Sequence, residues 1–144
     1  MGIPRVRTSV ICVHQGKLLA FRAQDPHSKQ EFVFLPGGQV ESDETAPEAG
    51  ARETLEETGF LVNVHPLSST DREYVFHWNN QDYDCLTLFY LATLASPMQR
   101  PVNDASYNLG VVWVLLNEVE STFSYSKDIL EAILELLATE RDQT

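Results

Sequence analysis

The sequence has few cysteines, few basic residues and no long hydrophobic run. Its two cysteines, Cys12 and Cys85, each lie in an apolar strand-like segment, so we expect buried free thiols rather than a disulfide. Ten Lys and Arg residues stand against 21 Asp and Glu, and the net charge of −11 disfavours long nucleic acids and anionic membranes as partners. No apolar stretch approaches transmembrane length, and the first residues lead into a strand pattern rather than a signal peptide. We therefore expect a cytoplasmic protein.

The length suits one domain, residues 1–144, because the chain contains no internal repeat, low-complexity tract or linker. Alternating apolar patterns and turn residues predict a succession of strands and two main helices. Strands are predicted for residues 5–14, 17–22, 31–35, 39–41, 60–64, 74–78, 83–94 and 110–116, with helices before residue 59 and over residues 127–137. A tight turn at Gln15 and Gly16 predicts one hairpin, and a second, longer hairpin is predicted around Asn79 and Asn80.

The segment Leu35–Phe60 consists of a glycine-rich turn and a helix with clear end signals. Thr45 and Glu48 fit a capping box, in which each side chain satisfies a backbone N–H of the other residue. Gly59 can adopt the left-handed conformation that ends a helix. Small residues on the inner face would allow a close approach to the sheet, with Leu55 as the anchor.

Three carboxylates, Glu53, Glu56 and Glu57, share one face of this helix at 100° per residue. At about 4 Å and an effective dielectric near 20, each pair would repel by roughly 4 kcal/mol before screening. A cluster of hard oxygen ligands suits a divalent cation such as Mg²⁺, which would relieve that repulsion. Taken alone, the same pattern would also describe a solvated acidic helix face.

The spacing of these residues resembles the signature of the Nudix hydrolases over residues 38–60. Gly38, Glu44, Arg52 and Gly59 stand at the required intervals around the three carboxylates, and the fixed polar and glycine positions are all present. Thr54 departs from the aliphatic residue that the family prefers, and we expect a small stability cost with intact chemistry. The resemblance implies an α/β/α sandwich with a mixed sheet. It also implies metal-dependent cleavage of a diphosphate linked to another moiety, with Mg²⁺ or Mn²⁺ as cofactor.

The resemblance implies roles for the residues of the box. Glu56 and Glu57 would bind the metal, together with the carbonyl oxygen of Gly37. Glu53 would be either a further ligand or the general base, because the family does not fix that division.

Arg52 would act in the same catalytic centre by orienting a box carboxylate. We expect it to pair with Glu44 or Glu56, so that Glu44 supports the site without touching the substrate.

Substrate contacts are expected from residues outside the helix. Gly38 lets the backbone pass close to a phosphate. Arg22 ends a buried run and could either bind a phosphate or be solvated. Asp104 is the acid available in the long polar loop 96–109, where family members often place substrate contacts. Glu118 and Glu120 are further acidic candidates, and surface positions are expected for Arg5, Arg7, His65 and His77.

The substrate is predicted to be a small nucleotide, best a nucleoside diphosphate sugar or ADP-ribose. Loop 96–109 and the aromatic residues Trp78 and Tyr83 could enclose groups on both sides of a diphosphate, so that binding energy from both ends positions the phosphates. Nucleoside triphosphates and dinucleoside polyphosphates are the alternative substrates. The same loop and hairpin could instead form a homodimer contact.

Three other functional classes fit the sequence less well. A non-catalytic nucleotide-binding regulatory module would usually have lost box carboxylates, and none is lost here. An isomerase of the isopentenyl diphosphate type needs a reactive cysteine, whereas Cys12 and Cys85 lie in buried-looking strands. Removal of RNA 5′ ends would require a basic track, which the net charge of −11 disfavours.

Overall fold

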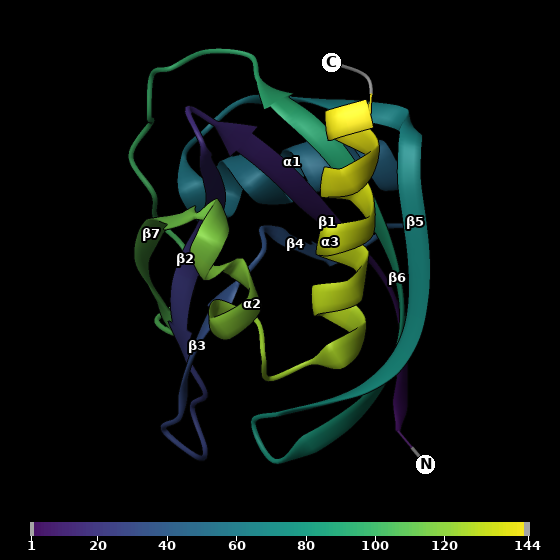
Figure 1. Ribbon diagram of the computed structural model, residues 1–144. Helices are drawn as coiled ribbons and strands as arrows, with labels where there is room; N and C mark the ends of the chain where they lie inside the picture. The colour runs from purple at the N-terminus through teal and green to yellow at the C-terminus, as the bar shows by residue number, and fades with distance from the viewer. Residues whose placement is uncertain (1, 143–144) are drawn as a thin grey trace.

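The computed structural model describes residues 2–142, which form a seven-stranded mixed sheet with helices on both faces (Figure 1). The predicted α/β/α sandwich is therefore confirmed. In chain order the elements are β1 (Ile3–His14), β2 (Lys17–Gln24), β3 (Glu31–Phe34), β4 (Gly37–Gln39), α1 (Ala46–Thr58), β5 (Val62–Trp78), β6 (Gln81–Leu94), β7 (Asn108–Leu115), the 3-10 helix η1 (Leu116–Glu118), α2 (Val119–Thr122) and α3 (Lys127–Asp142).

The main path of the sheet runs β3-β2-β1-β6-β5, while β4 pairs with β1 and β7 pairs with β2. The β1–β6 ladder is parallel and extends from Ile3 beside Tyr83 to Cys12 beside Ala92. All the other ladders between the described strands are antiparallel. One parallel ladder thus joins the start of the chain to a strand that follows it much later.

β1 and β2 form the predicted hairpin but separate soon after the turn. Gln15 and Gly16 adopt φ values of 53° and 76°, as the favoured two-residue hairpin turn requires. The ladder between the two strands contains only the pairs Val13–Leu18 and His14–Lys17. Beyond it, β1 continues with β4 and β6, whereas β2 continues with β3 and β7. The sheet therefore opens into two halves with space between them.

Each face of the sheet has its own hydrophobic core, since successive residues of β1 point to opposite sides. Ile11 packs in the core that includes the α3 residues Ala132 and Ile133. Val10 and Cys12 pack on the other side, with Phe60 and other residues around α1. In Figure 1, α3 lies in front of the sheet and α1 behind it. Both cysteines are buried and free, as expected.

The end signals of α1 are as predicted. The Thr45 hydroxyl accepts a hydrogen bond from the Glu48 N–H (3.2 Å), and the Glu48 carboxylate accepts one from the Thr45 N–H (2.8 Å). Gly59 ends the helix in the left-handed conformation with φ 79°. The start and end of the helix are therefore determined by residues within and next to it.

The inner face of α1 differs from the prediction. Leu55 is only partly buried, so the expectation that it anchors the helix is wrong. Thr54 is fully buried instead, and its hydroxyl donates to the Gly50 carbonyl at 2.7 Å. A Cβ on Gly50 would lie 2.9 Å from Val10 Cγ2. A small residue at position 50 therefore lets the helix approach β1 closely, and the polar side chain of Thr54 satisfies its own hydroxyl within the helix.

The hairpin β5–β6 is longer than predicted, and its tip is attached to another part of the molecule. Asn79 and Asn80 form the turn with φ values of 51° and 60°. Asp25, which is 2% exposed, accepts hydrogen bonds from the backbone N–H groups of Asn79 (3.1 Å), His27 (2.8 Å) and Ser28 (3.2 Å). Figure 1 shows the hairpin tip curving towards the loop between β2 and β3. Burial opposes ionisation of Asp25, but these hydrogen bonds outweigh it and hold its pKa below the usual value.

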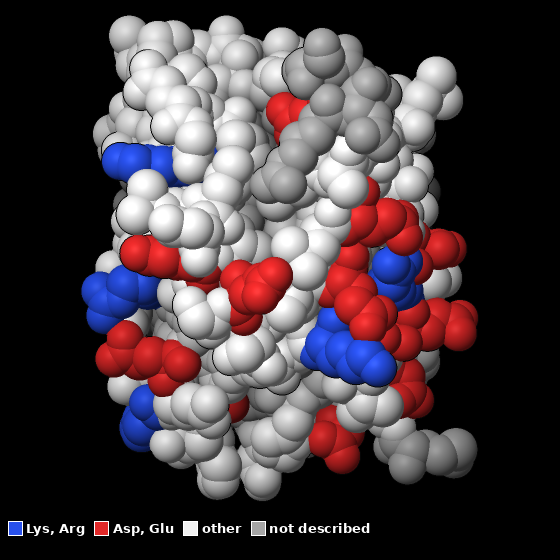
Figure 2. Space-filling view, viewed as in Figure 1, with Lys and Arg blue, Asp and Glu red and all other residues white. Residues whose placement is uncertain are grey.

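Acidic side chains predominate on the molecular face shown in Figure 2, and basic side chains lie among them. Arg72 pairs with Glu135 of α3 at 3.0 Å, and Lys127 lies 3.8 Å from Glu131. Among residues 2–142, no helix is long and apolar enough to cross a membrane.

Candidate active site

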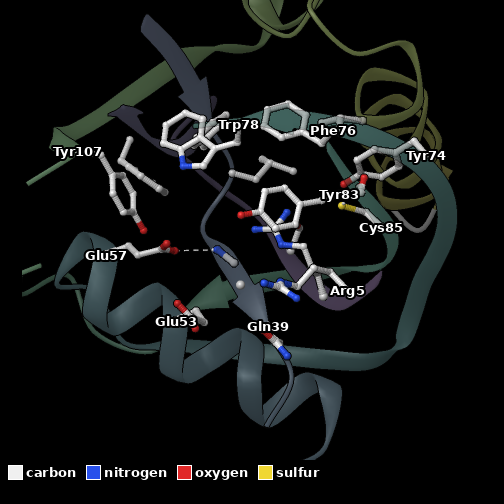
Figure 3. Close-up of a pocket in the computed structure, with 18 of the residues that line it drawn as sticks. Arg5, Gln39, Glu53, Glu57, Tyr74, Phe76, Trp78, Tyr83, Cys85 and Tyr107 are labelled. Atoms are coloured by element: carbon white, nitrogen blue, oxygen red, sulfur yellow. Dashed lines mark hydrogen bonds between the residues drawn. The ribbon is translucent and has the colours of Figure 1, made fainter. Parts of the chain in front are cut away.

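A pocket of about 320 Å³ occupies the space between the two halves of the sheet (Figure 3). Its volume lies within the range of small-molecule sites. Glu53 and Glu57 of α1 line one side, next to the glycines of β4. Aromatic side chains from β3, β5 and β6 line much of the remainder. The pocket thus joins a carboxylate-rich region to an aromatic one.

Glu57 is a buried carboxylate held by one backbone group. Its side chain accepts a hydrogen bond from the Gly37 N–H at 2.8 Å, drawn in Figure 3. Burial raises the pKa of Glu57 well above its usual value, and nearby Glu53 adds to this effect. The Gly37 N–H opposes the rise without cancelling it. The positive charge of Arg7 also opposes the rise, and a bound cation would compensate ionised Glu57 further.

Glu53 lies directly against the glycine turn. A Cβ on Gly38 would be 2.5 Å from the carboxyl carbon of Glu53 and 2.6 Å from one of its oxygens. Burial raises the pKa of Glu53, while the neighbouring Arg52 guanidinium opposes the rise. Glycine at position 38 therefore leaves room for the Glu53 carboxylate beside β4.

Arg52 connects three acidic side chains. Its guanidinium donates two hydrogen bonds to Glu44, at 2.7 and 3.0 Å, and further ones to Glu53 (3.0 Å) and Glu56 (3.3 Å). Arg52 was expected to pair with Glu44 or Glu56, and it pairs with both. The hydrogen bonds from Arg52 also hold the pKa of Glu44 below its usual value. Because one planar guanidinium contacts all three carboxylates, it orients Glu53 towards the pocket.

The metal-binding potential of the site rests on its oxygen donors. Glu56 is about half exposed and turned towards Arg52, whereas Glu53 and Glu57 line the pocket. Within the part of the chain that the structure describes, no three His, Cys, Asp or Glu side chains form a group that could hold a metal ion. The two pocket carboxylates and the nearby Gly37 carbonyl are nevertheless hard oxygen donors, the type that Mg²⁺ and Mn²⁺ prefer. A divalent cation would also offset the cost of burying two negative charges. The donor chemistry therefore fits such an ion.

The long loop before β7 is attached to the end of α1. The last carbonyl groups of a helix have no partner within it, so they must find donors elsewhere. Here three successive carbonyls accept hydrogen bonds from the loop and from the first residue of β7, which places the loop beside the end of α1 and Glu57. The donors are Asn108 Nδ2 to the Glu57 carbonyl (3.0 Å), Gln99 Nε2 to the Thr58 carbonyl (3.0 Å) and Arg100 N to the Gly59 carbonyl (2.8 Å).

This attachment positions two residues of the loop. Asp104 is exposed and accepts a hydrogen bond from Asn108 Nδ2 at 3.0 Å, so it lies near Glu57 but outside the pocket lining. Tyr107 does line the pocket, and Figure 3 shows its hydroxyl directed towards Glu57. Burial and the negative charge of Glu57 raise the pKa of Tyr107 to about 12. Tyr107 is not among the candidates that the sequence suggests, because only the tertiary path of the loop brings it to the pocket.

Aromatic rings form a continuous wall opposite the carboxylates. Trp78 lies 5.2 Å from Phe34 and 5.6 Å from Tyr107, measured between ring centroids. Phe76 lies 5.8 Å from Phe34, and Tyr83 also faces the pocket. The structure therefore brings both Trp78 and Tyr83 into the site. These rings offer flat apolar surfaces on which a planar group could stack.

Several arginines do not lie where the sequence suggested. Arg5 and Arg7 were expected at the surface, and this expectation is wrong, because both line the pocket. They share a face of β1 with Ser9, and the parallel ladder with β6 turns that face towards the pocket. Arg22 is exposed, pairs with Glu31 at 2.8 Å and lies outside the pocket lining. The acidic candidates Glu118 and Glu120 are exposed in η1 and α2, and His65 and His77 are exposed on β5.

Comparison with known proteins identifies the family. The model of the NUDIX domain matches residues 3–133. The protein belongs to the Nudix family. Members of this family are pyrophosphohydrolases that use divalent metal ions and act on small nucleotides, and the chain is assigned to that enzyme class.

Relatives of this Nudix hydrolase carry different descriptions. A "MutT-like protein" from Streptomyces ambofaciens is 30% identical over 127 residues, which cover 86% of this chain and 73% of the relative. An ADP-ribose pyrophosphatase from Streptococcus suis is 16% identical with a TM-score of 0.64, covering 96% of this chain and 92% of that one. An Ap4A hydrolase from C. elegans is 19% identical with a TM-score of 0.66, covering 95% and 98%. Because proteins named for different substrates share the fold, the substrate must be argued from the pocket.

Proposed function

We propose that this Nudix hydrolase cleaves the pyrophosphate bond of a nucleoside diphosphate linked to a sugar, such as ADP-ribose or a nucleotide sugar. The observation that carries the proposal is the pocket itself, which has Glu53 and Glu57 on one side and a wall of aromatic rings on the other. A diphosphate beside the carboxylates would leave one attached group to stack against Trp78 and Phe34. Tyr107, in the loop before β7, would provide a second surface for the other group. A triphosphate would use only one of these surfaces.

The acidic side of the pocket would hold Mg²⁺ or Mn²⁺ through Glu57, the Gly37 carbonyl and Glu53 or Glu56. Such an ion supplies charge neutralisation for the diphosphate and lowers the pKa of a bound water. Arg52 keeps Glu53 facing the pocket through their 3.0 Å contact. Because burial raises the pKa of Glu53, its carboxylate is a better proton acceptor than an ordinary glutamate. Glu53 is thus suited to accept the proton of the attacking water.

A substrate panel tests this proposal. ADP-ribose, several nucleotide sugars, dinucleoside polyphosphates and nucleoside triphosphates should be compared by kcat/KM, each with Mg²⁺ and with Mn²⁺. We expect a sugar-linked diphosphate to be preferred. Glu57→Gln should lose activity, whereas Glu118→Gln, an exposed acid outside the pocket, should serve as the matched control with unchanged rates. A clear preference for nucleoside triphosphates over every sugar-linked diphosphate would reject the substrate assignment.

A further inference from the structure

Arg7 lies in the pocket without a carboxylate partner. Its side chain is partly buried and lines the same cavity as Glu53 and Glu57. Among the side chains that the structure describes, residues 2–140, no carboxylate lies within salt-bridge distance of Arg7. Arg22 and Arg52, by contrast, each pair with at least one glutamate. In a chain with a net charge of −11, a partly buried arginine that remains unpaired within a pocket is an unusual feature.

The register of β1 places Arg7 close to the reactive end of the pocket. Arg7 pairs with Gln39 of β4, and Ser9 pairs with Gly37, whose N–H binds Glu57. The positive charge of Arg7 opposes the rise that burial causes in the pKa of both Glu53 and Glu57. Arg7, Glu53 and Glu57 thus line one pocket, and the β1–β4 ladder joins the strand of Arg7 to the glycine turn beside the two carboxylates.

The neighbouring arginine is already engaged. The guanidinium of Arg5 lies 4.9 Å from the centroid of the Tyr83 ring, in a cation–π arrangement, and it donates to the Pro4 carbonyl at 3.2 Å. Figure 3 shows Arg5 and Tyr83 together at one side of the pocket. Arg7 has no such ring contact; it lies beside the Tyr74 hydroxyl, which leaves most of its N–H donors available to a ligand. A guanidinium carries five N–H donors in a planar arrangement that matches two oxygens of a phosphate.

We propose that Arg7 binds a phosphate group of the substrate from the β1 side of the pocket and so positions the diphosphate against Glu53 and Glu57. The inference rests on the proposed function only in taking a diphosphate as the ligand. It does not depend on which organic groups are attached to the diphosphate. The phosphate would then lie between a fixed positive charge on β1 and the metal-binding carboxylates of α1. Arg7 contributes binding and orientation, and it transfers no proton.

The direct test measures binding of inorganic pyrophosphate by calorimetry in EDTA, where metal-mediated contacts are removed. We expect Arg7→Met to weaken binding by at least about tenfold, which corresponds to about 1.4 kcal/mol. Arg7→Lys should retain part of the affinity, because it keeps the charge but loses the planar donor pair. Arg22→Met is the matched control, since Arg22 is exposed outside the pocket, and its affinity should equal that of the wild type.

Two outcomes would overturn the inference. One is wild-type affinity in Arg7→Met, and the other is no measurable pyrophosphate binding by the wild-type protein. Thermal unfolding should show that each variant is folded, and Arg7→Gln carries the same test if the Met variant does not fold. Kinetics provide an independent readout, because loss of Arg7 should raise KM for every diphosphate substrate by a similar factor. A preference for triphosphates would reject the proposed substrate while leaving the pyrophosphate result for Arg7 in place.

Discussion

Replacing Glu57 by glutamine should separate the stability cost of the site from its catalytic use. Glu57 is 5% exposed, and burial raises its pKa well above the usual value. In metal-free buffer, the folded protein therefore retains a proton that the unfolded chain has already lost. The stabilisation from that proton is complete below the unfolded pKa and disappears as the pH rises through the folded pKa. The wild type should thus lose stability as the pH rises from mildly acidic values.

The expected magnitude follows from a difference of one proton. Between the unfolded and folded pKa values of Glu57, the wild-type free energy of unfolding should fall by about 1.4 kcal/mol per pH unit relative to Glu57→Gln. The amide oxygen of the introduced side chain would still accept the 2.8 Å hydrogen bond from the Gly37 N–H. Its new amide donors could remain unsatisfied at a cost of about 1–3 kcal/mol, but this offset would not vary with pH. The pH dependence of the difference is therefore the diagnostic quantity.

Urea unfolding of the wild type and Glu57→Gln at a series of pH values, with EDTA present, measures this difference. Saturating Mg²⁺ should then stabilise the wild type more than the variant, because a ligand of the native state stabilises it by mass action. Turnover of the variant should fall by about 10²–10⁴-fold. A stability difference that is independent of pH in EDTA would refute the reasoning, since it would mean that Glu57 ionises without penalty.

Three further predictions test particular contacts. Gly38→Ala should displace the Glu53 carboxylate, so kcat should fall while the melting temperature changes little. Gly16 has φ 76° and open space around it, so Gly16→Ala should lower the melting temperature and leave kcat unchanged. If kcat falls in Gly16→Ala, or stays unchanged in Gly38→Ala, then the space at Gly38 is not what positions Glu53 for activity. Thr8→Val should stabilise the protein by about 1 kcal/mol in urea unfolding, because the buried Thr8 hydroxyl has no hydrogen-bond partner among the residues that the structure describes. Destabilisation would show that the hydroxyl is satisfied. Asn108→Ala removes the donor to the Glu57 carbonyl, so amide hydrogen exchange in the loop before β7 should become faster. Unchanged exchange rates would show that other contacts hold the loop.

Features determined by neighbouring residues could be predicted from the sequence. The capping box of Thr45 and Glu48, the Gly59 helix end and the turn at Gln15 and Gly16 each depend on residues no more than a few positions apart. The pairing of Arg52 with two box carboxylates also follows from spacing on and just before one helix. These features required no knowledge of how distant segments meet.

Features that depend on distant segments could not be predicted. Charged residues at alternate positions of a strand indicate solvent exposure, and nothing near Arg7 in the sequence shows that its face of β1 borders a pocket. Helical periodicity has a similar limit. It places Glu56 and Glu57 on the same face, but their side chains differ strongly, since the Glu56 side chain is 51% exposed whereas Glu57 is 5% exposed. The position of the sheet relative to the helix decides that difference.

The parallel ladder between β1 and β6 also has a consequence for the order of folding. The hairpins β1–β2 and β5–β6 join neighbouring segments and can form early, whereas placing Ile3 beside Tyr83 requires the closure of a long stretch of chain. During synthesis, Arg7 leaves the ribosome long before the strand that turns it towards the pocket. A nascent chain that ends before β6 would contain all the carboxylates of the box and still lack the pocket. Pyrophosphate binding by stalled chains of increasing length would therefore report when the β1–β6 ladder closes.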